Sequence, residues 1–150
     1  MLKPQAPSER TVPPMRVQVL GPDSADLSAA DLRRLFRGRR MTPSRRQRLA
    51  GSGRVVAACG ARVVGLAAYE RTADELRVHE FAVDEVSPCQ AEHVVSALLE
   101  ALEVACLAGG GRRLVLLPRA AVAAPVLRAR GFATIAEGCA GSWFMKTFPS

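Results

Sequence analysis

The sequence contains little of what extracellular, metal-binding and membrane proteins depend on. Its four cysteines form no CxxC pair and its two histidines are too few for a metal site, so we expect buried thiols and no metal. No stretch free of Asp, Glu, Lys and Arg exceeds about eight residues, whereas a membrane-spanning helix needs about twenty. The first ten residues have no long apolar run behind a basic cap, so we expect no secretory signal. The resulting expectation is a cytoplasmic protein without a membrane span.

Aromatic residues are also scarce, but hydrophobic residues make up 49% of the 150 residues. A chain of this length and composition can bury about two-thirds of its unfolded surface in one core. Four prolines fall within residues 1–14, where apolar content is low. We therefore expect a flexible proline-rich tail over 1–14 and a single domain over 15–150.

Charge is distributed unevenly along the chain. Residues 1–62 carry 13 basic and 4 acidic side chains, residues 63–107 carry 2 and 9, and residues 108–150 carry 6 and 1. A bias toward arginine and alanine is typical of GC-rich bacterial coding sequences, so clustering is more informative than number. Eight of the arginines lie within 16 residues, at 33, 34, 37, 39, 40, 45, 46 and 48.

This arginine cluster is either a solvated face or a site for an acidic partner, an acidic substrate or nucleic acid. Only one aromatic residue, Phe36, is interleaved with it, which disfavours nucleic acid. We take the candidate partner-binding residues to be Arg33, Arg37, Arg40, Arg45, Arg46 and Arg48.

Hydrophobic periodicity predicts seven strands and four helices in the order βααβββαβαββ. Cap and turn residues support these boundaries: Ser28 with Asp31, Thr42 with Pro43, Gly60, and Gly131 after the last helix. The class is α/β (α+β), a mixed, mostly antiparallel sheet of about seven strands with helices on both faces. The strands are expected at 15–20, 54–59, 62–69, 75–83, 114–117, 132–135 and 142–148, and the main helices at 29–36, 43–50, 87–107 and 120–130.

Three local segments and this order resemble the GCN5-related N-acetyltransferase (GNAT) superfamily over roughly residues 16–148. Phe81-Ala82-Val83-Asp84 is similar to the end of the family's fourth strand, and 97–103 (ALLEALE) to its central helix. Residues 127–132 (LRARGF) resemble the turn after its last helix. The resemblance implies a parallel pair formed by strands 75–83 and 113–117, and an acyl group moved from acyl-CoA to an amine.

The resemblance also implies an acyl-CoA site, with a degenerate motif. The family binds the pyrophosphate at Gln/Arg-x-x-Gly-x-Gly/Ala, where amides at a helix start meet phosphate. In this chain only Gln90 fits. We expect the helix to begin early, with Ser87 as cap and Pro88 in the first turn, so that side chains block the phosphate position. The implied donor-site residues are Phe81, Val83, Gln90, Ala91, Glu92, His93, Val94 and Val95.

The candidate catalytic residue is Glu80, where many family members carry a carboxylate that removes a proton from the amine. The alternative is a carboxylate held in a salt bridge. The tyrosine that often protonates the leaving thiolate is replaced by Leu127, and the only tyrosine, Tyr69, lies on another strand. Cys89 and His93 share a helix face in this interpretation, but no third residue orients them as a nucleophile or metal pair.

Three hypotheses follow from these residues. The first is an acyltransferase with a divergent donor site that acts on a small or protein amine. The second is an acyltransferase whose donor rides on acyl carrier protein, an acidic partner that the arginine cluster would bind. The third is a GNAT-fold binding or assembly module without catalysis. The oligomeric state, including a homodimer, stays open.

Overall fold

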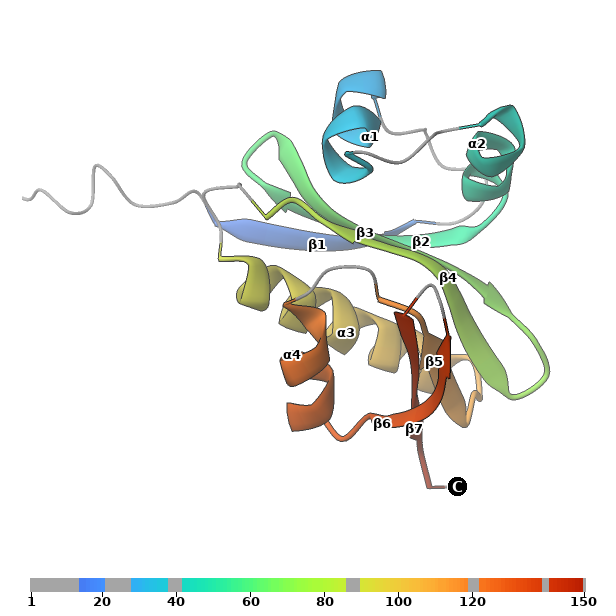
Figure 1. The fold of residues 1–150 in the computed structure, drawn as a ribbon. Helices are drawn as coiled ribbons and strands as arrows, with labels where there is room; N and C mark the ends of the chain where they lie inside the picture. The colour runs from blue at the N-terminus through green and yellow to red at the C-terminus, as the bar shows by residue number, and fades with distance from the viewer. Residues whose placement is uncertain are drawn as a thin grey trace, which may run out of the picture.

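The computed structural model describes residues 14–20, 28–37, 42–85, 90–118, 122–138 and 141–149, and it confirms the predicted element order. Most of the proline-rich segment expected as a tail lies outside these residues. Figure 1 shows the sheet with helices packed on both of its faces. The elements are β1 (Met15–Leu20), α1 (Ala29–Leu35), α2 (Pro43–Ala50), β2 (Gly53–Cys59), β3 (Arg62–Arg71), β4 (Glu75–Val83), α3 (Ala91–Ala108), β5 (Arg113–Leu116), α4 (Ala123–Ala129), β6 (Ala133–Gly138) and β7 (Gly141–Thr147).

The seven strands form one sheet in the order β1-β2-β3-β4-β5-β7-β6. All neighbours are antiparallel except β4 and β5, which pair in parallel from Glu75 opposite Arg113 to Val78 opposite Leu116. The predicted parallel pair is therefore confirmed. It arises because α3 carries the chain from the end of β4 back to the start of β5, as a crossover connection must.

Each face of the sheet has its own core. Helices α3 and α4 pack on one face, where the larger cluster includes Val78, Phe81 and Leu98. Helices α1 and α2 cover the other face around Leu66, Ala68 and other buried residues. Among the described residues, no helix is both long and apolar enough to cross a membrane.

Local caps fix the helix ends as the sequence predicts. The Ser28 hydroxyl accepts a hydrogen bond from the Asp31 amide and the Thr42 hydroxyl accepts one from the Arg45 amide, both at 3.1 Å. Helix α4 ends on Gly131, whose φ of +95° lets the Phe132 amide donate to the Leu127 carbonyl at 3.0 Å.

The start of α3 corrects an expectation. Gln90 is the N-cap with extended backbone (φ −65°, ψ 132°), so α3 begins at Ala91 and cannot continue from Ser87 and Pro88, which lie outside the described residues. The Gln90 side chain makes no capping hydrogen bond, although its carbonyl accepts from the Val94 amide at 3.1 Å. The first helical amides, at residues 91–93, therefore have no acceptor within the helix.

Helix α3 packs very closely on β3. A Cβ added to Gly65 would lie 2.7 Å from Val94 Cγ1 and 3.0 Å from Leu98 Cδ1, closer than real Cβ contacts. Glycine at this position lets the helix backbone approach the sheet. Val94 and Val95 are both fully buried by this packing.

Candidate functional site

A β-bulge in β4 turns two consecutive polar side chains toward one face. Glu80 lies opposite Ala68 and Val78 lies opposite Tyr69, so His79 is an extra residue in β4. Val78 and Phe81, on either side of the bulge, both belong to the core under α3. His79 and Glu80 instead lie against α2 on the other face. An unbroken strand would have placed these two neighbours on opposite faces.

The bulge coincides with the point where β4 leaves β5. The parallel register ends at Val78 opposite Leu116, whereas β4 continues to Val83. In the described residues, β4 has no registered partner on its β5 side beyond Val78. His79 and Glu80 thus lie where β4 and β5 begin to separate in the middle of the sheet.

The Glu80 carboxylate is held by Arg45 from α2. Arg45 Nε donates to Oε2 and Nη2 donates to Oε1, each at 2.7 Å. The Arg45 and Glu80 side chains are only 21% and 10% exposed, and the guanidinium lies 5.1 Å from the centre of the Phe36 ring. A planar fork with two short, charge-assisted hydrogen bonds defines the orientation of the carboxylate.

The His79 ring is held by Ser52, which precedes β2. The Ser52 hydroxyl donates to the Arg48 carbonyl at 2.6 Å and lies 2.8 Å from His79 Nε2. Because a hydroxyl has one proton, Ser52 accepts from His79, and the proton of the neutral ring is on Nε2. Nδ1 is buried without a hydrogen-bond partner among the described residues. Burial, followed by the charge of Arg48, lowers the pKa of His79 below its usual value, so the ring is neutral at neutral pH.

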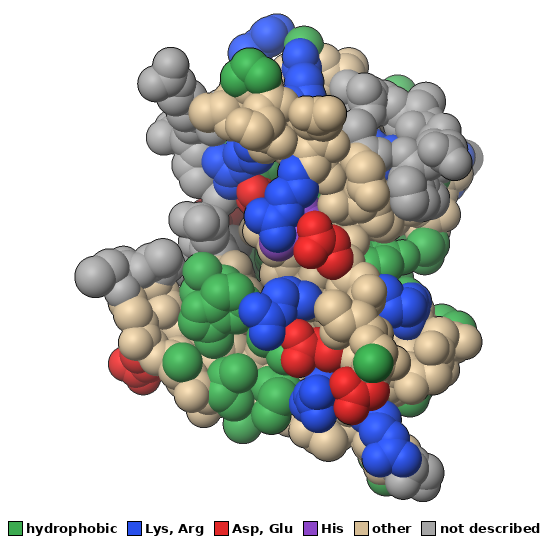
Figure 2. All heavy atoms as spheres, turned by 90° about the vertical axis from the view of Figure 1, so that its right-hand side faces the viewer, with side chains coloured by type: hydrophobic (Ala, Val, Ile, Leu, Met, Phe, Trp, Pro, Cys, Tyr) green, Lys and Arg blue, Asp and Glu red, His purple; other side chains and the backbone are tan. Residues whose placement is uncertain are grey.

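These residues line a pocket of about 430 Å³ between α2 and β4, formed by Ser44, Arg45, Arg48, His79 and Glu80. Its volume lies within the range of small-molecule sites. Figure 2 shows arginine, acidic and histidine side chains gathered on one face of the molecule. Two arginines and one glutamate give the lining a net positive charge.

The sequence predicted Glu80 and the arginines as site residues, but it did not predict that His79 and Ser44 line this pocket or that Ser52 holds the His79 ring. One pattern could have indicated the bulge. The buried residues of β4 are Leu76, Val78, Phe81 and Val83 on the α3 side, spaced 2, 3 and 2. A spacing of three on one face requires an extra residue, and that residue is His79.

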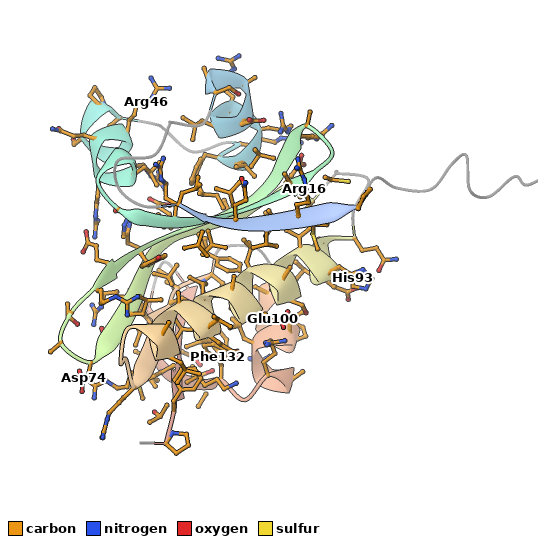
Figure 3. All side chains as sticks on the ribbon, turned by 180° about the vertical axis from the view of Figure 1, so that it is seen from behind. Arg16, Arg46, Asp74, His93, Glu100 and Phe132 are labelled. Carbon is orange, nitrogen blue, oxygen red and sulfur yellow. The ribbon has the colours of Figure 1, made fainter. Side chains whose placement is uncertain are left out.

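The predicted donor-site residues divide into two groups. Phe81, Val83, Val94 and Val95 are buried, and Ala91 is half-buried. Gln90, Glu92 and His93 are exposed at the start of α3, and Figure 3 shows His93 at that end of the helix. The Val95 side chain lies in the core, and the blocking of the phosphate position by side chains stays a prediction. Among the described residues, Gln90, Glu92 and His93 extend into solvent near the first helical amides.

The arginine cluster is not one surface. Arg33, Arg37, Arg46 and Arg48 are exposed, and Figure 3 shows Arg46 extending away from α2. Arg45 is half-buried and bound to Glu80, and its role in partner binding stays a prediction. Arg40 lies outside the described residues.

The remaining candidates are not brought together. Leu127 is fully buried, and Tyr69 packs beside Gly53, away from the pocket. Cys89 lies outside the described residues, whereas Cys59 and Cys106 are buried and form no disulfide. Among the described residues, no three His, Cys, Asp or Glu side chains form a group that could hold a metal ion.

Comparison with known proteins finds the fold but no sequence family. No protein-family model and no curated protein match the sequence. The GNAT domain of S. lividans PAT matches with a TM-score of 0.64 and 17% identity, over 89% of this chain and 90% of its own. N-acetylglutamate synthase from Neisseria gonorrhoeae, complexed with coenzyme A and N-acetyl-glutamate, matches with a TM-score of 0.68 and 14% identity, over 90% of this chain and 36% of its own.

The PaiA N-acetyltransferase from Thermoplasma acidophilum, in complex with coenzyme A, matches with a TM-score of 0.53 and 13% identity. That match covers 63% of this chain and 60% of the PaiA chain. The chain therefore spans less than two-thirds of PaiA and of the synthase. The shared feature is the fold, with identities too low to carry residue roles.

Proposed function

Because the chain has the fold of the GCN5-related N-acetyltransferases, we propose that it transfers an acyl group from an acyl thioester to an amine. The amine binds in the pocket between α2 and β4, and the thioester approaches along the part of β4 that has left β5. The observation that carries this proposal is the bulge at His79, which turns Glu80 into the pocket at the point of separation.

The proposed chemistry needs one base. The acceptor ammonium gives a proton to Glu80, directly or through a water, and the amine nitrogen then attacks the thioester carbonyl carbon. The C–N bond forms as the C–S bond breaks, and the nitrogen gives its second proton to solvent water. Leu127 cannot protonate the departing thiolate, so we assign that proton to solvent.

Arg45 constrains how Glu80 works. The two hydrogen bonds from the guanidinium occupy one acceptor site on each carboxylate oxygen. A carboxylate has about four acceptor sites, so this pairing does not by itself prevent proton transfer. A base held in this way gives slow turnover unless substrate binding loosens the pair.

The donor site is divergent in this proposal. The amides of residues 91–93 suit an anionic group, but Glu92 places a carboxylate beside them. Neighbouring structures bind coenzyme A, which supports an acyl-CoA donor. A donor carried on acyl carrier protein remains the alternative, with exposed Arg33, Arg37 and Arg46 as the surface for its acidic residues.

A second candidate function is a binding or assembly module without catalysis. Two observations favour it: the carboxylate is already paired with Arg45, and leucine occupies the position of the family's proton donor. Loss of the donor motif, which the sequence indicates, also fits this alternative.

The test is thermal unfolding of the protein with acetyl-CoA, with longer acyl-CoAs and with acylated carrier protein, followed by an amine acylation assay. A ligand at 100 times its dissociation constant stabilises the native state by about 2.7 kcal/mol. Stabilisation by one donor together with amide formation supports the acyltransferase. If no donor binds and no amide forms, the non-catalytic module is the better description.

A further inference from the structure

Arg48 offers unused hydrogen-bond donors to the pocket. Its Nε contacts Glu70 Oε2 at 3.3 Å, and the two side chains are 55% and 51% exposed. The two terminal nitrogens of Arg48 make no hydrogen bond in the part of the chain that the structure describes. Exposed ion pairs of this kind contribute at most about 1 kcal/mol, so a ligand can replace this contact at little cost.

The charge of the pocket selects against a simple amine. Among the lining residues Arg45 and Arg48 outweigh Glu80, and Glu70, which contacts Arg48 from outside the lining, offsets part of this positive charge. His79 is neutral because its pKa is lowered by burial and by Arg48. A monoamine is a cation and brings no negative charge to compensate the arginines. An amine that also carries one carboxylate brings that negative charge, and the planar fork of arginine matches the two oxygens of a carboxylate.

The spacing of the two charged positions indicates a small ligand. Arg45 and Arg48 are three residues apart on α2, which places their Cβ atoms about 5–6 Å from each other. Arg45 contacts the Glu80 carboxylate directly, so Glu80 and the Arg48 guanidinium are neighbours on this wall of the pocket. A ligand that joins them needs only a few bonds between its amine and its carboxylate.

We infer that the acceptor is a small amino acid, with its carboxylate bound by the terminal nitrogens of Arg48 and its amine facing Glu80. The inference rests on the proposed acyltransferase function and names the acceptor class for that site. Ser44, the other pocket residue from α2, lies beside this position in the first turn of the helix. The Arg48 guanidinium carries one positive charge, which balances the single negative charge of a carboxylate better than the double charge of a phosphate.

The experiment uses matched ligands and a matched variant. L-alanine, β-alanine and 4-aminobutyrate are compared with ethylamine and propylamine, by calorimetric binding to the full chain and by acylation kinetics. Arg48→Gln removes the carboxylate partner, and Arg16→Gln removes an exposed arginine of β1 that does not line the pocket. Circular dichroism checks that both variants fold.

We expect the carboxylated amines to bind at least tenfold more tightly than the plain amines. Arg48→Gln should abolish that difference, and Arg16→Gln should leave it intact, since a hydrogen bond to a charged group is typically worth such a factor. Equal binding of both ligand sets, or equal effects of both variants, overturns the inference. Acylation of plain amines as efficient as that of amino acids also overturns it, while leaving the acyltransferase proposal in place. Arg48-dependent binding of amino acids without acylation by any donor supports the ligand class and removes the proposed function.

Discussion

Arg45 on α2 and Glu80 on β4, 35 residues apart in the sequence, form a bidentate ion pair with both hydrogen bonds at 2.7 Å. The pair joins the helix layer to the bulge of β4. One arginine expected on a partner surface thus holds the carboxylate expected to act as base. Replacing Arg45 therefore tests the structural role of the pair, and replacing Glu80 tests the catalytic role of its carboxylate.

The first prediction concerns this pair. Arg45→Gln leaves the mostly buried Glu80 without its guanidinium, so we expect the free energy of unfolding to fall by about 1–3 kcal/mol. Glu80→Gln keeps the shape of the side chain, and in an active enzyme it should lower kcat by roughly 100-fold or more. Urea unfolding and acylation kinetics measure the two effects. Unchanged kcat in Glu80→Gln would make Glu80 a purely structural residue.

The second prediction concerns pH. The pKa of His79 is lower in the folded protein than its ordinary value of about 6.5, because burial and Arg48 disfavour the charged ring. The unfolded chain then binds more protons between these two values, so the contribution of His79 to stability is fully present above pH 6.5. That contribution is lost as the pH falls below 6.5 through the folded pKa.

Urea unfolding between pH 7.5 and 5 checks this pH dependence. His79→Gln should give a shallower loss of stability than the unchanged protein. His93→Gln is the matched control, because it removes the exposed histidine at the start of α3. If both variants lose stability with the same slope as the parent, His79 is not the responsible group.

The third prediction concerns the donor site. Replacing the exposed residues, Glu92→Arg with His93→Gly, should increase the affinity for acetyl-CoA, because the carboxylate beside the free amides becomes a cation. Val95→Ala should instead reduce stability by about 1–3 kcal/mol, since it opens a cavity in the core without uncovering the helix start. Calorimetry and thermal unfolding distinguish these outcomes. Tight acetyl-CoA binding by the unchanged protein would show that the degenerate motif is no obstacle.

The fourth prediction concerns the contact between α3 and β3. Gly65→Ala places a Cβ 2.7 Å from Val94 Cγ1, so we expect a loss of about 1–3 kcal/mol in the free energy of unfolding. Gly138→Ala is the control, because nothing lies within 4 Å of a Cβ at that position. Adding Val94→Ala to Gly65→Ala should restore part of the loss. Additive losses in the double variant would contradict a direct clash.

The order of elements and the architecture could be predicted from the sequence because the relevant patterns are local. β4 was predicted with its observed bounds, since apolar residues alternate on both sides of the bulge. Ser28, Thr42 and Gly131 act within a few residues of themselves, and their predicted roles as caps and helix end are confirmed. The start of α3 was misplaced because Ser87 and Pro88 resemble a cap, whereas Gln90 adopts the extended backbone that defines the actual one.

The candidate site was decided by tertiary packing. The sequence alone does not distinguish between the eight clustered arginines. The packing of α2 on the sheet brings Arg45 to Glu80 and leaves Arg48 at the pocket with unused hydrogen-bond donors. The bulge that turns His79 beside Glu80 depends on pairing with β3, and Ser52 reaches the ring from a segment 27 residues earlier. Local propensity determines which residues form a strand or helix, but contacts between distant segments determine which side chains meet. Those contacts exist only once both faces of the sheet are packed.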